Sequence, residues 1–242
     1  MPDLLHLVVT LVVSFVAATL AAVAGFGGAA VLLPVLVWTF GIRDAIPILT
    51  VAQLIGNGSR VWYNRHELNW RVVVWFALGG VPTALLGGLL FARAPLVALT
   101  RILGVFLIIV VVWRHAHPKS IWRPSLPAFA GIGAGASFLS ALLGSVGPLM
   151  APFFLAYGLL KGAYIGTEAL STVVMHVTKL IAYRQAAVLP LHSVLAGIAL
   201  GPVMILGSFA GKRVLDRLRE DVFVWIIEAT LIVAGLLFLI KG

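Results

Sequence analysis

The chain contains no cysteine, which excludes disulfide bonds, thiolate metal sites and thiol catalysis. It is also poor in charge: charged residues make up 10% of its 242 residues, whereas hydrophobic residues make up 62%. An average soluble domain is only about 45–50% apolar. Apolar runs follow one another along the whole chain, and no linker between them is long enough to fold alone. We therefore predict a single membrane domain over residues 1–242.

Acidic residues are the scarcer charged type, with 8 Asp and Glu against 17 Lys and Arg and a net charge of +9. Such a charge can indicate nucleic-acid binding, but the basic residues lie mostly in short connections between apolar runs. That placement is typical of membrane topology, in which Lys and Arg collect on the cytoplasmic side. The sequence has no basic surface interleaved with aromatic residues, so we expect no nucleic-acid partner.

Motifs of enzymes and metal sites are missing as well. The sequence has no phosphate-binding loop, no HExxH and no GxSxG, because Gly144, Ser145 and Gly147 have the wrong spacing for the last of these. His176 has no second histidine or carboxylate at ligand spacing on its helix face. We predict that the protein is not an enzyme and has no cofactor and no metal centre.

A membrane-spanning helix needs about 17–25 predominantly apolar residues. About eight segments have this character, near residues 4–24, 44–63, 71–91, 96–113, 126–143, 163–183, 190–211 and 222–240. Two further apolar pieces, 28–40 and 147–158, are shorter, and each follows a glycine-rich break. Such half-helices or re-entrant segments are tolerated at membrane depth only where protein or a water-filled cavity satisfies the backbone. The expected fold is an all-α polytopic membrane protein with about eight long helices and two short ones.

The two glycine breaks indicate an internal repeat. When the chain is aligned with itself at an offset of 119, Gly25 falls on Gly144 and Gly28 falls on Gly147. At an offset of 120 the matching pairs are Pro82 and Pro202, Gly87 and Gly207, and Arg93 and Arg213. Chance overlap of glycines in a glycine-rich membrane protein is the alternative explanation. The order of long and short segments is the same in both halves, which favours two repeats, at about 4–114 and about 126–240.

Each repeat has an odd number of crossings, so the two repeats must be inverted, as in many secondary transporters. Basic residues predict the orientation. Ten lie on one side, namely Arg65, Arg71, Arg114, Lys119, Arg123, Lys161, Lys212, Arg213, Arg217 and Arg219, and five lie on the other, namely Arg43, Arg93, Arg101, Arg184 and Lys241. The richer side is expected to face the cytoplasm, which places both termini outside it.

Two polar stripes, related by the repeat, are the candidate binding residues. Gln53, Asn57 and Arg60 stand at i, i+4 and i+7 in an apolar segment, and at an offset of 119 they fall on Thr172, His176 and Lys179. A cation inside a span is costly and usually faces the bundle interior, where an anion is its natural partner. Alternatively, Arg60 and Lys179 lie near their segment ends and extend to the membrane interface, while Gln53 and Asn57 join helices by hydrogen bonds.

The glycines offer a second set of binding groups. A helix interrupted at Gly25, Gly27 and Gly28 begins again near Gly28, where free amides and the positive end of the dipole attract an anion. Gly144 and Gly147 repeat the arrangement, and glycine lets ligand oxygens approach the backbone closely. Close packing of helices through small residues is the alternative explanation for each glycine taken singly.

Acidic residues inside spans are candidates for proton coupling. Glu228 sits well inside the last segment, and Glu168 precedes the second polar stripe by about one turn. An ionisable residue at membrane depth is a functional-site hypothesis by default; a structural hydrogen bond in the neutral form is the alternative for Glu228. His176 is also placed to titrate near neutral pH.

Several stretches of the sequence resemble those of a known family. The runs GFGGAAVLLPVLVWTFG, TVAQLIGNGSRVWYNRHELNWR and GGVPTALLGGLL resemble the first half of the TauE/SafE-type sulfite exporters, also called the four-toluene-sulfonate uptake permease family. The run GSVGPLMAPFFLAYGLLKGAYIGTEALSTVVMH resembles the second half more loosely. The resemblance implies a multi-pass permease of the bacterial inner membrane with duplicated halves, which moves sulfite, sulfonates or related anions.

The expected function is therefore secondary transport of a small anion by alternating access, with the lipid bilayer around the protein and with protons or Na⁺ as candidate coupling ions. The main alternative is an anion channel, and a membrane enzyme or an assembly scaffold is a more distant one. The sequence leaves open whether the protein is a homo-oligomer.

Overall fold

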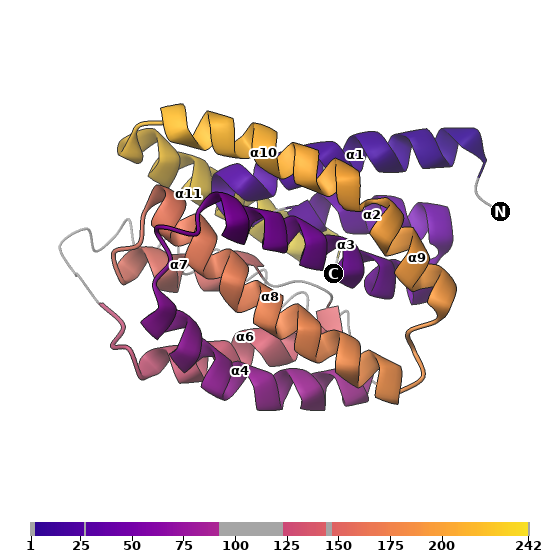
Figure 1. Cartoon of the computed structure of the whole chain (residues 1–242), viewed down its shortest axis with the longest axis horizontal. Coiled ribbons are helices and arrows are strands. Elements are labelled where there is room, and N and C mark those ends of the chain that lie inside the picture. The colour runs from indigo at the N-terminus through magenta and orange to yellow at the C-terminus, as the bar shows by residue number, and fades with distance from the viewer. Residues whose placement is uncertain (1–2, 27, 92–122, 144–146, 242) are drawn as a thin grey trace.

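The computed structural model describes residues 3–26, 28–91, 123–143 and 147–241, and every regular element in them is helical (Figure 1). The helices are α1 (Leu4–Ala24), α2 (Gly28–Phe40), α3 (Ile42–Tyr63), α4 (Trp70–Leu90), α6 (Ala128–Leu143), α7 (Gly147–Ala156), α8 (Lys161–Gln185), α9 (Leu191–Ala199), α10 (Gly201–Arg217) and α11 (Glu220–Lys241). The all-α prediction is confirmed for these residues, and α2 and α7 are the two short helices expected after the glycine breaks. The predicted segment 96–113 lies outside the described residues.

Among the described residues, three helices are long and apolar enough to cross a membrane: Leu4–Ala24, Trp70–Leu90 and Leu191–Arg217. The structure divides the last of these into α9 and α10 at Leu200, where Pro202 lacks the amide that would continue the hydrogen-bonding pattern. Helices α3 and α8 contain 22 and 25 residues, so they are about 33 and 38 Å long. Only three helices are long and apolar enough among the described residues, so the count of eight long membrane helices stays a prediction.

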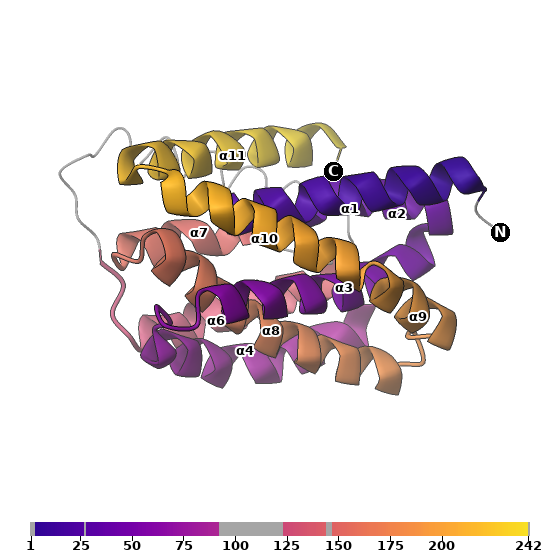
Figure 2. The same ribbon diagram turned by 45° about the horizontal axis from the view of Figure 1, so that its top comes forward.

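Corresponding helices of the two predicted repeats run in opposite directions (Figure 1). Helices α1 and α3 run from the right end of the view to the left, whereas their counterparts α6 and α8 run from left to right. Helices α4 and α10 are opposed in the same way, and Figure 2 shows the same arrangement from a second angle. The connections 64–69, 157–160 and 218–219 therefore lie at one end of the bundle, and the N-terminus and residues 186–190 lie at the other.

Local signals explain where α1 begins and ends. The carboxylate of Asp3 caps its first turn by accepting a hydrogen bond from the backbone amide of His6 at 2.9 Å, and this bond lowers the pKa of Asp3. The helix ends at Gly25, whose φ of 83° lies in the left-handed region that favours glycine. Only three residues join α1 to α2, so α2 turns back and packs against α1.

Glycines bring α4 and α6 into close contact along their length. A Cβ added to Gly79 would meet the backbone of Ala130, and one added to Gly133 would meet the backbone of Phe76. Small residues at helix contacts are typical of membrane proteins, in which association depends on close packing. The glycines therefore allow the backbones of α4 and α6 to pack directly against each other.

The outer surface of the bundle is strongly apolar. Large apolar side chains such as Leu4, Leu191 and Trp225 are 78%, 72% and 67% exposed. A soluble protein rarely exposes contiguous apolar surface of this kind. The exposed Trp62, Trp70 and Trp225 lie near helix ends at one end of the bundle, the position that tryptophan favours at a membrane interface.

Candidate functional site

A small cavity of about 20 Å³ lies where the two glycine breaks meet the polar stripes. It is formed by the end of α1, the beginnings of α2 and α7, and the middle of α3 and α8. Its lining consists of Ala21, Gly25, Phe26, Gly28, Ala29, Gln53, Asn57, Arg60, Gly147, Met150, Glu168, Thr172, Met175 and His176. Eight of the predicted binding residues are in this lining, namely Gly25, Gly28, Gln53, Asn57, Arg60, Gly147, Thr172 and His176. The predicted Gly27 and Gly144 lie outside the described residues.

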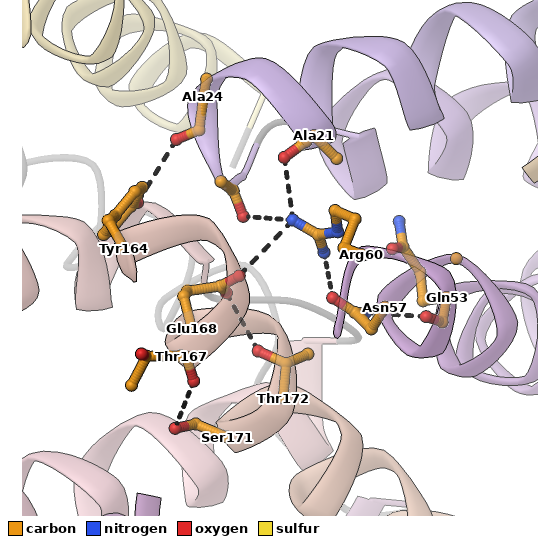
Figure 3. A network of polar contacts seen from close by, with 12 residues as sticks. Ala21, Ala24, Gln53, Asn57, Arg60, Tyr164, Thr167, Glu168, Ser171 and Thr172 are labelled. Carbon is orange, nitrogen blue, oxygen red and sulfur yellow. Dashed lines mark hydrogen bonds and ion pairs between the residues drawn. The ribbon is translucent and has the colours of Figure 1, made fainter. Parts of the chain in front are cut away.

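Arg60 is at the centre of the polar contacts around this cavity (Figure 3). It is only 3% exposed. Its Nη1 donates to the carbonyl oxygens of Ala21 at 2.8 Å and Gly25 at 2.9 Å, and its Nη2 donates to Oδ1 of Asn57. An arginine that extended to the membrane interface would be exposed, so Arg60 does not act as a surface anchor.

Glu168 supplies the negative charge beside Arg60. Its Oε2 lies 3.5 Å from Nη1 of Arg60, and both side chains are buried. Its other oxygen, Oε1, accepts a hydrogen bond from the hydroxyl of Thr172 at 2.9 Å (Figure 3). The two charges balance each other, which a buried ion requires in surroundings of low polarity.

The interruption of the helix after α1 provides hydrogen-bond acceptors for Arg60, which could not be predicted from the sequence. Gly25 ends α1 so that the carbonyl oxygens of Ala21 and Gly25 face the guanidinium group. These carbonyls belong to the last turn of the helix, where the dipole is negative. The break thus produces a cation-binding helix end as well as the helix start expected at Gly28.

Both new helix starts line the cavity, at Gly28 of α2 and Gly147 of α7. The glycines there also have a packing role. A Cβ on Gly28 would meet the carbonyl oxygen of Ala17, and a Cβ on Gly147 would meet Phe26. Close helix packing, the alternative explanation of these glycines, therefore applies to both positions, and valine substitutions there would disturb packing whether or not an anion binds.

The second polar stripe is only partly in the cavity. Thr172 and His176 are in the lining, whereas Lys179 is not, although it is fully buried. Nζ of Lys179 donates to Oγ of Ser140 at 3.2 Å and lies 3.5 Å from Nδ1 of His176. Lys179 is thus one helical turn beyond the cavity, next to α6.

The two cations make equivalent contacts in the two halves of the chain. Arg60 bonds to Ala21 and Lys179 bonds to Ser140, and both pairs are 39 residues apart. Ala21 and Ser140 correspond at the offset of 119 that relates the polar stripes. In each half, the cation therefore reaches the same place on the first helix of that half.

Several neighbours of the cavity were missed by the sequence analysis. Met150, Met175 and Phe26 are in the lining, but apolar residues in an apolar chain carry no distinguishing signal. Tyr164 packs over Gly25, and its hydroxyl donates to the carbonyl oxygen of Ala24 at 3.3 Å. Its position one turn before Glu168 on α8 was a signal that could have identified it.

Glu228, the other predicted acid, is in α11 and is half-buried there. It is not in the lining of the cavity. Among the residues that the structure describes, no group of three or more His, Cys, Asp or Glu side chains could hold a metal ion.

Comparison with known proteins gave one finding. A family model described as Sulfite exporter TauE/SafE matches residues 10–238. No curated protein and no solved structure matches the chain. The matched range includes all the residues that line the cavity.

Proposed function

Because the chain belongs to the TauE/SafE sulfite exporter family, which consists of membrane transporters and not of enzymes, we propose that it carries a small sulfur-containing anion through the cavity around Arg60. The candidate substrates are sulfite, sulfonates and other organic sulfur acids. The protein is a multi-pass membrane protein, and the proposed location is the bacterial inner membrane.

The buried guanidinium of Arg60 is the observation that carries this proposal. An anion that enters the cavity meets Arg60 together with the amide groups at the starts of α2 and α7. Helix starts attract anions through their free amides and the positive end of the dipole. Gln53, Asn57, Thr172 and His176 add hydrogen-bonding groups to the same lining, as recognition of several oxygen atoms requires.

The apolar part of the lining suits an organic sulfur acid. Phe26, Met150 and Met175 face the same space as the polar groups. A sulfonate has three oxygens on one side and a carbon substituent on the other, so it can contact both kinds of surface. Methionine is well suited to such contacts, because its side chain is flexible and polarisable.

Three observations support two inverted repeats and alternating access between them. An offset of 119 residues in the sequence relates the two polar stripes. Corresponding helices run in opposite directions (Figure 1). Arg60 and Lys179 each bond to a residue 39 positions earlier in the chain. Transporters of this plan bind substrate where the repeats meet and expose the site to each side in turn. Repeats at about 4–114 and 126–240 would place the cavity between them.

An anion channel is the alternative function. A transporter exchanges labelled for unlabelled substrate across a membrane without net flux, whereas a channel shows conductive flux and no counterflow. Proteoliposomes loaded with unlabelled sulfonate and supplied with labelled sulfonate outside distinguish the two, and counterflow is the expected result.

Substitution of Arg60 tests the site itself. We expect Arg60→Gln to weaken substrate binding more than tenfold, because removing one partner of a desolvated charge pair costs about 2–5 kcal/mol. Arg65→Gln is the matched control: Arg65 is exposed in the connection after α3 and bonds to the backbone of Trp62. Affinity is measured in proteoliposomes, with insertion and thermal stability checked in parallel. Equal affinities of both variants and the wild type would refute the assignment of Arg60.

A further inference from the structure

We propose that the substrate anion and the Glu168 carboxylate compete for Arg60, so that anion binding is accompanied by uptake of one proton on Glu168. This coupling rests on the proposed transport function and assigns the proton as its coupling ion. It is inferred from the way in which the structure holds Arg60.

Arg60 has no unused charge to offer in the conformation described. Its partners are three neutral oxygens, on Ala21, Gly25 and Asn57, and one carboxylate, on Glu168. The carboxylate is the more distant of the measured partners, at 3.5 Å compared with 2.8 and 2.9 Å for the two carbonyls. An arriving anion can therefore replace Glu168 while the backbone carbonyls continue to position the guanidinium.

Charge balance requires a further change when this replacement occurs. Arg60 and Glu168 together are neutral, and both are buried. Adding one anion leaves a negative charge that this pair does not compensate, which is unfavourable in surroundings of low polarity. A proton on Glu168 restores neutrality, because Arg60 then pairs with the anion and Glu168 becomes a neutral acid.

Thr172 can accommodate both forms of Glu168. Its hydroxyl donates to Oε1 of the carboxylate at 2.9 Å. A hydroxyl can also accept a hydrogen bond, so it can turn and accept a hydrogen bond from the O–H group of the neutral acid. Glu168 therefore keeps a partner after it releases Arg60.

The other titratable groups near Glu168 come from α3 and α8. They are Arg60 on α3 and Tyr164 and His176 on α8, with Lys179 further along α8 beside His176. The residues that α1, α2 and α7 contribute to the cavity are Ala21, Gly25, Gly28, Ala29, Gly147 and Met150, and none of them titrates. Glu168 is the acid that contacts Arg60, so it is the group whose charge the anion replaces.

The step balances for a monovalent anion. One anion and one proton enter together, the ion pair of Arg60 with Glu168 is exchanged for one of Arg60 with the anion, and the net charge of the site stays the same. Transport of a monovalent sulfonate is then electroneutral. Binding and protonation promote each other reciprocally, so affinity rises as the pH falls.

The test uses methanesulfonate, a strong-acid anion that does not itself take up a proton near neutral pH. For the wild type in proteoliposomes, we expect uptake to carry protons into the lumen and to be driven by an inward proton gradient. Affinity is expected to rise about tenfold for each unit by which the pH falls, over the pH range in which Glu168 is charged in the empty site. Asp44→Asn is the control, because Asp44 lies away from the cavity and bonds to His192 and Ser193.

Glu168→Gln replaces the carboxyl group with an amide that is uncharged at every pH, so this variant mimics the neutral acid. We expect this variant to bind methanesulfonate and to exchange it by counterflow, with an affinity independent of pH and no response to a proton gradient. The same pH response in Glu168→Gln as in the wild type would overturn the proposal. Net uptake of methanesulfonate by the wild type without proton movement would also overturn it, even if the variant failed to fold, while counterflow by the same protein would leave the transport function standing. Absence of counterflow with methanesulfonate, toluenesulfonate and sulfite alike would refute the proposed function itself.

Discussion

At the scale of single residues, the position of Arg60 follows from its need for hydrogen-bond acceptors. A guanidinium group has five N–H donors, and an arginine without partners inside a membrane protein is costly. The end of α1 provides the carbonyls of Ala21 and Gly25, and Asn57 provides a side-chain oxygen one turn away on α3. Arg60 is therefore held in place in the described conformation, and such preorganisation would favour binding of the proposed substrate.

Lys179 does not line the cavity, so we predict that its substitution affects stability more than substrate affinity. Lys179→Gln is expected to change substrate affinity by less than about threefold and to lower thermal stability, because it removes a buried contact with Ser140 between α8 and α6. Affinity in proteoliposomes and the melting temperature in detergent are the two measurements. A loss of affinity as large as that of Arg60→Gln would show that Lys179 meets the substrate.

At the scale of elements, glycine decides how closely α4 and α6 pack. On α6, Gly133 faces the backbone of Phe76, whereas Gly131 and Gly135 have no atoms near the position of an added Cβ. The three glycines thus share one helix but differ in their surroundings. Their spacing places Gly133 on the side that contacts α4.

This difference gives a matched pair of substitutions. We expect Gly133→Ala to destabilise the protein by about 1–3 kcal/mol, because the new methyl group forces the helices apart. Gly135→Ala should leave stability unchanged or raise it slightly, because alanine favours helix by about 1 kcal/mol over glycine. Thermal melting of the purified variants measures both effects. Equal melting temperatures would contradict the close contact between α4 and α6.

At the scale of the whole molecule, the distribution of charge predicts the orientation in the membrane. The connections 64–69, 157–160 and 218–219 lie at one end of the bundle, and Arg65, Arg219 and the start of α8 at Lys161 are in or next to them. The opposite end has Arg184 near the connection 186–190. Basic connections favour the cytoplasm, so the first end is expected to face inwards.

The absence of cysteine makes this orientation simple to test, because a single introduced thiol is the only one in the protein. We predict that Gln185→Cys, at the exposed end of α8, reacts with a membrane-impermeant thiol reagent added to intact cells. His66→Cys, exposed in the connection after α3, should react only after the membrane is opened. The reverse pattern would invert the proposed topology and place both termini in the cytoplasm.

Much of the architecture could be predicted because helix formation in a membrane depends on local composition. The predicted segment 4–24 coincides with α1, and 28–40 coincides with α2. The segment 190–211 was expected to be one helix, but a break at Leu200 divides it into α9 and α10. A proline inside a membrane segment can either bend or interrupt a helix, and neighbouring packing decides between these outcomes.

The sequence alone determined the membrane character of the protein, its all-helical class and the residues that share a helix face. Spacing of i, i+4 and i+7 places Gln53, Asn57 and Arg60 together on α3 whatever surrounds them, because the helical period is local. Family membership followed from the same residues and is confirmed over residues 10–238.

Only the tertiary structure decided which of these faces meet. Arg60 and Glu168 are 108 residues apart in the chain and are brought together by the packing of α3 against α8. Lys179 has the same place in its stripe as Arg60, yet it lies beyond the cavity and contacts α6. Arg60 and Lys179 correspond at the sequence offset of 119, but one of them lines the cavity and the other does not, so equal spacing in the chain does not produce equal surroundings.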